Sequence, residues 1–227
     1  MADRPGLVLQ NENEAPAALL EDWLRERELP HTTVRVWEQG VPDNPREYGW
    51  MVALGTSDSA TQTDPGWIPA EIDYLRRAVD ANVPVLGICF GGQALSVALG
   101  GQISPADPVS MGWFEVDTED PRLVPPGPWL HFNYERFSIP AGATQIATSP
   151  SGPGAFRLGP HLGIQFHPEV TPAIVEEWAE SESSKLADRG LDLDALRAQT
   201  RRLAARAAAE AFDLFDAWRQ LAATPAR

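Results

Sequence analysis

The sequence predicts an α/β domain with a mostly parallel central sheet flanked by helices, a small antiparallel extension and a C-terminal helical tail. Short apolar runs alternate with segments whose apolar residues recur at helical spacing, which is typical of parallel strands joined by helices. The length of 227 residues suits one such domain and leaves no room for a second large catalytic module. We place its core at about residues 7–180 and the helical extension at about residues 190–222.

The first half of the chain supplies the predicted parallel strands and the helices between them. Four apolar runs predict strands at residues 7–9, 33–36, 50–54 and 83–88. One helix is expected at residues 17–27, with an apolar face made of Leu19, Leu20, Trp23 and Leu24. A second helix is expected at residues 69–81, with Ile72, Leu75 and Val79 buried.

The second half begins with a short helix after Cys89 that ends at Gly100 and Gly101. Short candidate strands separated by proline- and glycine-rich turns then predict the antiparallel extension, at residues 113–116, 145–147 and 156–158. A buried strand at 162–166 is followed by a helix at 172–178. The tail at 191–221 carries an apolar stripe that we expect to pack on the domain, the alternative being a dimer or partner contact.

Composition narrows the classes of function. A net charge of −14 argues against a surface for nucleic acid or anionic membranes, because both need clustered basic charge. No apolar run is long enough to span a bilayer, and the first residues do not form a secretory signal. A single cysteine excludes an internal disulfide, and these points together predict a cytoplasmic protein. We expect no cofactor.

That single cysteine lies in Gly87-Ile88-Cys89-Phe90-Gly91, which has the form G-x-nucleophile-x-G between an apolar strand and a helix. A nucleophile on such a turn has a strained backbone, and flanking glycines let neighbouring segments pass close to it. The helix that follows favours a thiolate at Cys89, and the N–H of Phe90 is a candidate oxyanion donor. The alternative is a buried structural cysteine.

Among the four histidines, His167 is the best candidate for a base. It ends the apolar strand at 162–166, and Cys89 ends another strand, so both lie where chemistry gathers in an α/β sheet. Glu169, two residues on, could orient the imidazole as the acid of a triad does. The alternatives are a solvent-bonded histidine and an exposed carboxylate. No histidine spacing matches a zinc site, so no metal is expected.

With the stretches GICFGGQ and FHPEV, the sequence resembles the class I (triad-type) glutamine amidotransferases, most of all small members similar to the glutaminase domain of GMP synthase. The resemblance covers about residues 7–178. It implies a flavodoxin-like fold in which Cys89 attacks the side-chain amide of glutamine and His167 shuttles the proton. Glu169 would orient the imidazole of His167. The products would be glutamate and ammonia, formed through a γ-glutamyl thioester.

The resemblance also implies roles for residues around this trio. The backbone N–H of Gly55 would join that of Phe90 in the oxyanion hole, although Thr56 replaces the family's second glycine. Gly91 would give the substrate clearance, and Gln93 would hold it. Two further segments match the substrate cleft of the family, namely Met111-Gly112-Trp113 and the stretch at 131–137. In the second segment, Asn133, Tyr134 and Glu135 replace the usual histidine, glycine and aspartate.

Three functions remain open from the sequence. The first is a glutaminase that supplies ammonia to a separate synthetase, because the chain has no phosphate-binding loop of the G-x-x-x-x-G-K-[ST] type. The second is a γ-glutamyl hydrolase or peptidase acting on a γ-glutamyl conjugate, for which the altered residues Asn133, Tyr134 and Glu135 would suit a changed substrate. The third is a non-catalytic binding or regulatory subunit, against which the presence of Cys89, His167 and Glu169 counts.

Overall fold

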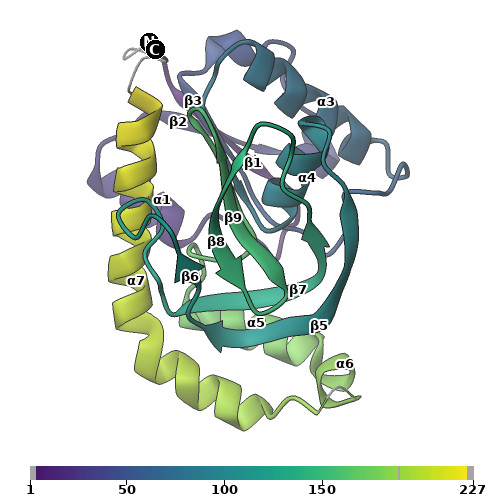
Figure 1. Ribbon diagram of the computed structural model, residues 1–227, viewed down its shortest axis with the longest axis vertical. Helices are drawn as coiled ribbons and strands as arrows, with labels where there is room; N and C mark the ends of the chain where they lie inside the picture. The colour runs from purple at the N-terminus through teal and green to yellow at the C-terminus, as the bar shows by residue number, and fades with distance from the viewer. Residues whose placement is uncertain (1–3, 189, 224–227) are drawn as a thin grey trace.

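The computed structural model describes residues 4–188 and 190–223, whose largest element is an eight-stranded sheet (Figure 1). Its strands are β1 (Gly6–Gln10), β2 (His31–Arg35), β3 (Trp50–Ala53), β4 (Val85–Ile88), β6 (Asp117–Thr118), β8 (Thr144–Ser149), β9 (Gly152–Leu158) and β10 (His161–Ile164). They are ordered β2-β1-β3-β4-β10-β9-β8-β6. A separate two-stranded sheet pairs β5 (Ile103–Phe114) with β7 (Trp129–Phe137).

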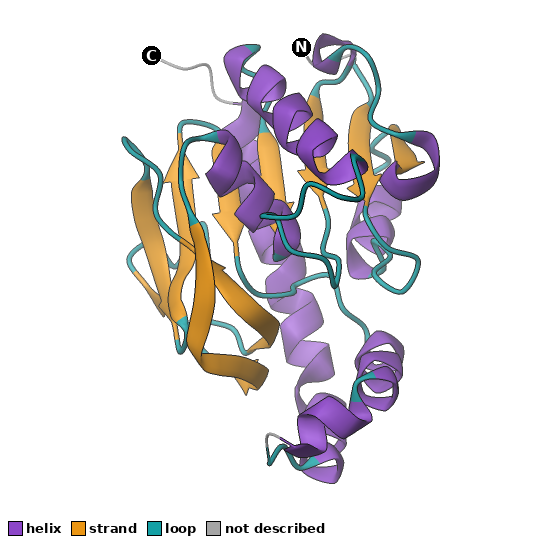
Figure 2. Cartoon of the chain, turned by 90° about the vertical axis from the view of Figure 1, so that its right-hand side faces the viewer, coloured by secondary structure: helices purple, strands orange, loops and turns teal. Residues whose placement is uncertain are grey.

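The sheet has a parallel and an antiparallel part. The five strands β2, β1, β3, β4 and β10 run parallel, in the order of a flavodoxin-like fold. Strands β9, β8 and β6 then continue the sheet in antiparallel fashion. Figure 2 shows these antiparallel strands gathered at one side of the molecule. The predicted mostly parallel sheet with an antiparallel extension is therefore confirmed.

Helices cover both faces of the parallel strands. They are α1 (Leu19–Glu26), α2 (Val36–Gln39), the 3-10 helix η1 (Pro45–Glu47), α3 (Trp67–Asp80), α4 (Phe90–Ala98), α5 (Pro172–Ser181), α6 (Ser183–Asp188) and α7 (Leu193–Ala223). Residues Leu7, Leu9 and Met51 face a core shared with α3 and α4. Their neighbours Val8 and Val52 face a core shared with α1 and α7. This alternation follows from the two-residue period of a strand.

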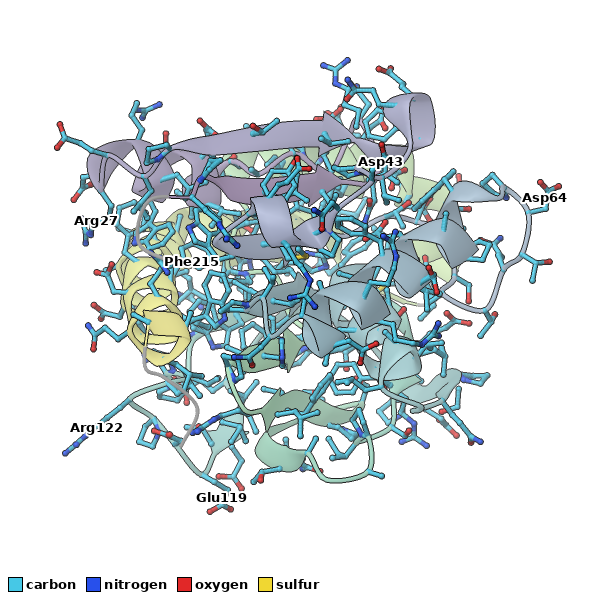
Figure 3. The ribbon with its side chains drawn as sticks, turned by 90° about the horizontal axis from the view of Figure 1, so that it is seen from above. Arg27, Asp43, Asp64, Glu119, Arg122 and Phe215 are labelled. Carbon is cyan, nitrogen blue, oxygen red and sulfur yellow. The ribbon has the colours of Figure 1, made fainter. Side chains whose placement is uncertain are left out.

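The C-terminal helix α7 runs along one face of the sheet. Its apolar stripe is buried there, with Phe215 against Trp23 at a ring distance of 5.5 Å and Trp218 edge-on to Trp50 at 6.1 Å. Seen from above, Phe215 points from α7 into the protein, whereas Arg27 lies at the periphery (Figure 3). The expected packing of the tail on the domain is confirmed, so the stripe is covered within the chain.

Most element predictions are confirmed, and most of the exceptions lie in the middle and near the end of the chain. Strand β7 was not predicted, because its mixture of buried and half-buried positions does not alternate regularly. Strand β5 extends ten residues before the predicted start at 113, and it shifts register between Pro105 and Ser110. The short helices α2 and α6 were also missed. None of the described helices is long and apolar enough to cross a membrane.

Helix α4 lies unusually close to the sheet, because glycines form the contact. A Cβ atom on Gly91 would lie 2.0 Å from the carbonyl oxygen of Ala53 in β3. A Cβ atom on Gly92 would lie 2.5 Å from the carbonyl oxygen of Ile164 in β10, and one on Gly87 would lie 2.3 Å from that of Gly91. Only glycine permits backbone to pass backbone at this distance. These glycines therefore fix where α4 begins.

A buried polar contact joins β1, β3 and α3. The side-chain N–H of Asn11 donates to the carbonyl of Leu54 at 3.0 Å and to the carboxyl of Glu71 at 3.1 Å. Asn11 is 2% exposed and Glu71 is fully buried. Burial raises the pKa of Glu71 to about 8, although the hydrogen bond from Asn11 acts in the opposite direction. This contact holds the end of β3, immediately before Gly55.

We expect Gly91→Ala to lower the free energy of unfolding by about 2 kcal/mol, because the added methyl group overlaps backbone that cannot move aside. Chemical denaturation measures the change. The control is Gly66→Ala, at a helical φ of −64° where a Cβ atom meets nothing within 4 Å. Equal effects of the two substitutions would contradict close packing of α4.

We expect Glu71→Gln to stabilise the protein increasingly as the pH rises from about 5 to 8. In the unfolded chain the carboxyl ionises near its ordinary pKa of 4.5, whereas in the folded protein burial raises its pKa to about 8. The native state therefore binds more protons across this interval, and wild-type stability falls as the pH rises. Glutamine cannot ionise, so the difference should reach a few kcal/mol.

The measurement is urea unfolding of both proteins at several pH values. Glu177→Gln is the control, because this glutamate is also on a helix but exposed. Parallel stability curves for wild type and Glu71→Gln would show that burial does not hold the proton.

Candidate active site

Cys89 lies between β4 and α4, with φ of 52° and ψ of −109°. A positive φ is uncommon for a residue with a side chain and stores backbone strain. The N–H of Cys89 donates to the carbonyl of Ile164 at 2.9 Å, so the neighbouring strand β10 holds the turn. The sulfur sits at the N-terminus of α4, whose unpaired N–H groups and dipole favour a thiolate.

The 6%-exposed Cys89 side chain lines a pocket of about 790 Å³. The loops after β1 and β3 form one part of its wall, and β7 and the end of α5 form the rest. Gln93 and His167 also line this pocket. The carboxyl ends of β1, β3 and β4 therefore meet here, as expected for a ligand site in a sheet of this type.

His167 follows β10, and its imidazole is held from two sides. Its Nδ1 lies 2.7 Å from Oε1 of Glu169, and the indole of Trp178 packs edge-on to the ring at 4.9 Å. The N–H of His167 donates to the carbonyl of Leu130 at 2.9 Å. His167 is 4% exposed and Glu169 2% exposed. Nε2 of His167 is buried and has no hydrogen-bond partner among the described residues.

The charges around His167 favour an imidazolium. Burial is the largest influence on its pKa and acts to lower it, because it penalises the charged form. The negative charges of a Cys89 thiolate and of Glu169 together outweigh burial and raise the pKa of His167 to about 10. At neutral pH the imidazole of His167 is therefore protonated on both nitrogens, and Glu169 holds the N–H at Nδ1.

The other three histidines lie elsewhere. His131 and His161 are buried, and burial lowers the pKa of His131 to about 3 and that of His161 to about 4. Both are therefore neutral at ordinary pH. His31 lies 3.0 Å from a carboxylate oxygen of Glu21 on α1. Of the four, His167 alone lines the pocket that holds Cys89.

Gln165 is a residue of the site that the sequence analysis missed. Its side chain is fully buried, and its Nε2 donates to the sulfur of Cys89 at 3.8 Å. Its Oε1 accepts from Nε2 of Gln93 at 3.5 Å, and that same nitrogen donates to the carbonyl of Glu135 at 3.2 Å. The sequence feature that could have pointed to Gln165 is that it is the one polar residue in the otherwise apolar run Leu162–Phe166.

Gly55 and Phe90 flank Cys89 from two segments. A Cβ atom on Gly55 would lie 3.3 Å from Cε1 of His167 and 3.8 Å from Cβ of Cys89, so this loop passes directly beside both. Phe90 is the first residue of α4, and its N–H has no acceptor within the helix. Its side chain is buried against Trp67 at a ring distance of 5.8 Å.

Asn133 and Tyr134, on β7, line the same pocket. The side-chain nitrogen of Asn133 donates to the carbonyl of Glu135 at 3.0 Å and to the hydroxyl of Ser151 at 3.3 Å. The Tyr134 hydroxyl donates to the carboxylate of Glu182 at 3.2 Å. Both residues thus form part of the wall of the pocket that Cys89 lines, and their contact with a substrate stays a prediction.

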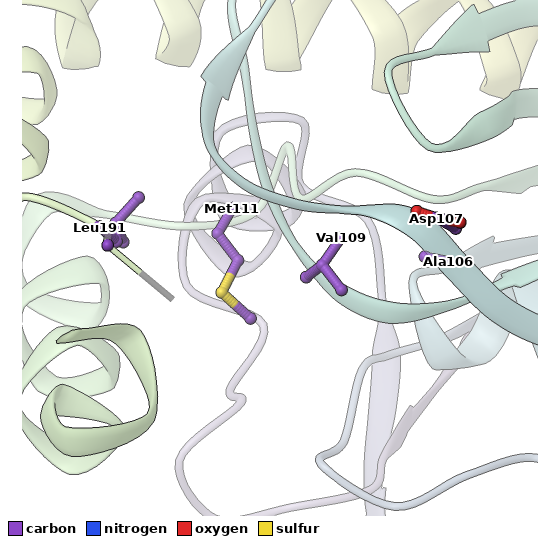
Figure 4. Close-up of a pocket in the computed structure, with 6 residues that line it drawn as sticks. Ala106, Asp107, Val109, Met111 and Leu191 are labelled. Atoms are coloured by element: carbon purple, nitrogen blue, oxygen red, sulfur yellow. The ribbon is translucent and has the colours of Figure 1, made fainter. Parts of the chain in front are cut away.

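The structure does not bring Met111, Gly112 and Trp113 to this pocket. Met111 lines a separate cavity of about 470 Å³ with Leu191 (Figure 4). The indole N–H of Trp113 donates to the hydroxyl of Thr200 on α7 at 2.8 Å. A substrate contact for these three residues stays a prediction. Gly91 packs against Ala53, so its role is in placing α4.

The comparisons with known proteins agree on a family. The sequence profile of the family described as glutamine amidotransferase class-I matches residues 59–177. A GMP synthase (glutamine-hydrolyzing) of Neisseria meningitidis is 35% identical over 104 residues, covering 40% of this chain and 20% of that protein. One of Vibrio vulnificus is 32% identical over 130 residues, covering 53% and 24%. The match spans about a fifth to a quarter of these relatives.

Solved structures agree in fold. A glutamine amidotransferase of Thermotoga maritima superposes with a TM-score of 0.85 at 21% identity, covering 97% of this chain and 99% of that one. One of Methylobacillus flagellatus gives a TM-score of 0.88 at 23% identity, covering 99% and 97%. The profile match covers more than half of the sequence and includes Cys89 and His167. The chain belongs to the class-I glutamine amidotransferase family.

Proposed function

We propose that the protein cleaves the side-chain amide of glutamine through a thioester on Cys89, releasing glutamate and ammonia for a separate acceptor enzyme. One observation supports this proposal: Cys89 and His167 line a single pocket, and Glu169 binds Nδ1 of His167, whose Nε2 has no hydrogen-bond partner among the described residues. A thiolate and an imidazolium in this relation are the reactants that amide cleavage needs.

In the first half of the reaction, the Cys89 thiolate attacks the amide carbon and forms a tetrahedral intermediate. The N–H groups of Gly55 and Phe90 stabilise its oxyanion. His167 then gives its Nε2 proton to the amide nitrogen, the carbon–nitrogen bond breaks, and ammonia leaves. The raised pKa of His167 suits this step, because the proton is already in place when attack begins.

In the second half, the now neutral His167 takes a proton from water, which attacks the thioester. The carbon–sulfur bond breaks, and glutamate leaves together with a regenerated thiolate and imidazolium. Glu169 keeps Nε2 of His167 facing the pocket in both halves, as the acid of a triad does. Gln165 and the N-terminus of α4 support the thiolate between turnovers.

A separate acceptor is proposed because ammonia transfer needs an activated substrate. Activation by a nucleotide through a phosphate-binding loop has no matching motif in the chain. The curated relatives that it matches are named as glutamine-hydrolysing synthases and are several times longer than the matched region. We therefore propose that a partner synthetase activates the acceptor and receives the ammonia.

A second candidate is hydrolysis of a γ-glutamyl conjugate, and the size of the pocket favours it. A volume of about 790 Å³ lies within the range of sites that take ligands much larger than one amino acid, about 300–1,000 Å³. Both candidates share the chemistry at Cys89 and differ in the amine that leaves.

We expect Cys89→Ala to abolish glutamate release from glutamine, because no other described residue in the pocket is a thiol. The assay follows glutamate with time, and thermal unfolding of the variant checks that the fold persists. An unchanged rate in the variant would rule out catalysis by Cys89 for either candidate function.

We expect the isolated chain to hydrolyse glutamine slowly and to accelerate when its acceptor enzyme binds, because an unregulated glutaminase would waste substrate. Proteins that co-purify with the chain supply the acceptors to be added. High activity of the isolated chain on a γ-glutamyl conjugate, with little on glutamine, would favour the second candidate. Absence of glutamate release with every partner added would count against ammonia donation.

A further inference from the structure

The outer part of the pocket that holds Cys89 is acidic. Glu12 and Glu14 line it from the loop after β1, Asp58 lines it from the loop after β3, and Glu135 lines it from β7. Within the described part of the chain, none of these four carboxylates forms an ion pair. The described residues that line the pocket include no lysine or arginine.

Burial separates this acidic part from the reacting residues. Cys89, Gln93 and His167 are 4–6% exposed and lie deep in the protein. Glu12, Asp58 and Glu135 are half-buried, and Glu14 is exposed. A substrate whose amide carbon reaches Cys89 therefore extends outward past the carboxylates.

Neutral donors hold two of these carboxylates in place. The carboxylate of Glu12 accepts from the N–H of Ser57 at 2.6 Å and from its hydroxyl at 2.9 Å. The carboxylate of Glu135 accepts from the hydroxyl of Ser59 at 2.7 Å. Hydrogen bonds from uncharged groups fix the position of a carboxylate and leave its charge uncompensated.

Asn133 adds a second sign of a ligand. It is 3% exposed, and its nitrogen is engaged by Glu135 and Ser151. Its Oδ1 has no hydrogen-bond partner among the described residues, although the residue lines the pocket. Buried acceptors are almost always satisfied, so this oxygen calls for a donor from a ligand. An N–H group supplies one.

The carboxylates are too dispersed to hold a metal ion. The described residues contain no group of three or more histidine, cysteine, aspartate or glutamate side chains that could bind one. Dispersed negative charge instead suits a molecule with separated positive charges. A γ-glutamyl group has one ammonium and one carboxylate, so pairing its ammonium uses one lining residue and leaves the others unmatched.

We propose that the pocket selects γ-glutamyl amides whose amine part carries a distal positive charge, such as amides of a diamine or polyamine. The inference rests on the second candidate function proposed above, cleavage of a γ-glutamyl conjugate at Cys89, and adds the class of amine that leaves in place of ammonia. The sulfur of Cys89 bonds to the side-chain carbonyl carbon of the γ-glutamyl group, the carbon–nitrogen bond at that carbon breaks, and the amine takes the proton of His167. Water then releases glutamate from the thioester, so no further reactant is needed.

Two substrates of equal length test this inference. The γ-glutamyl amide of diaminobutane carries a distal ammonium, and the γ-glutamyl amide of pentylamine has a methyl group in its place. We expect kcat/KM to be at least about tenfold higher for the charged amide, which corresponds to about 1.4 kcal/mol. Added salt should reduce the preference, because exposed charges are screened.

Substitutions of the lining carboxylates test whether these residues cause the preference for the charged amide. In a double variant with Glu14→Gln and Asp58→Asn, we expect the ratio of the two kcat/KM values to fall several-fold. The matched control is Glu119→Gln, which removes one exposed carboxylate far from the pocket and should leave the ratio unchanged. Binding of both amides to Cys89→Ala, measured by calorimetry, gives the same comparison without turnover.

The outcomes separate this inference from the proposed function. Equal or better use of the pentylamine amide, with turnover present, overturns the charge preference and leaves the amide chemistry standing. No turnover of either amide or of glutamine refutes the proposed function, and calorimetry then decides whether the pocket still prefers the charged ligand. Equal affinities in calorimetry overturn the inference in that case also.

Discussion

The close approach of α4 to the sheet governs the rest of the site. Gly87, Gly91 and Gly92 let the helix backbone meet β3 and β10 at distances that any side chain would prevent. A helix that starts this close to the end of β4 forces the intervening residue into the positive φ of 52° at Cys89. The strain is sustained by packing on two neighbouring strands, and it places the sulfur at the helix N-terminus. The reactive position of the cysteine is thus a consequence of backbone packing.

The pocket has two regions that differ in how their charges are compensated. At the floor, a thiolate and the carboxylate of Glu169 keep His167 charged against the cost of burial. Nearer the mouth, carboxylates from the loops after β1 and β3 and from β7 have no cationic partner among the residues that the structure describes. The charges at the floor compensate one another within the protein, whereas we propose that a ligand compensates the charges near the mouth. Because of this contrast we propose that Cys89 and His167 carry out the chemistry and that Glu12, Glu14, Asp58 and Glu135 determine selectivity.

The loop after β3 connects these regions to the core. Asn11 holds Leu54, the residue before Gly55, and is itself bonded to the buried Glu71 on α3. Glu12, the next residue after Asn11, binds Ser57 further along the same loop. Two consecutive residues at the end of β1 therefore fix the beginning and the middle of a loop that lies beside Cys89 and His167. The buried Glu71, through Asn11, and the half-buried Glu12 therefore both help to hold the loop after β3.

The sequence by itself determined the features that depend on neighbours along the chain. The apolar runs gave the parallel strands, the period of the tail gave its buried stripe, and the order strand, Cys89, glycines, helix gave the turn. Because parallel strands end at one edge, it also predicted that Cys89 and His167 could meet. Only the tertiary structure decided the contacts between distant segments: Gln165 at the sulfur, Asn11 on Glu71, β5 paired with β7, and Met111 in another cavity. These depend on which side chains the fold brings together, and no local pattern encodes that.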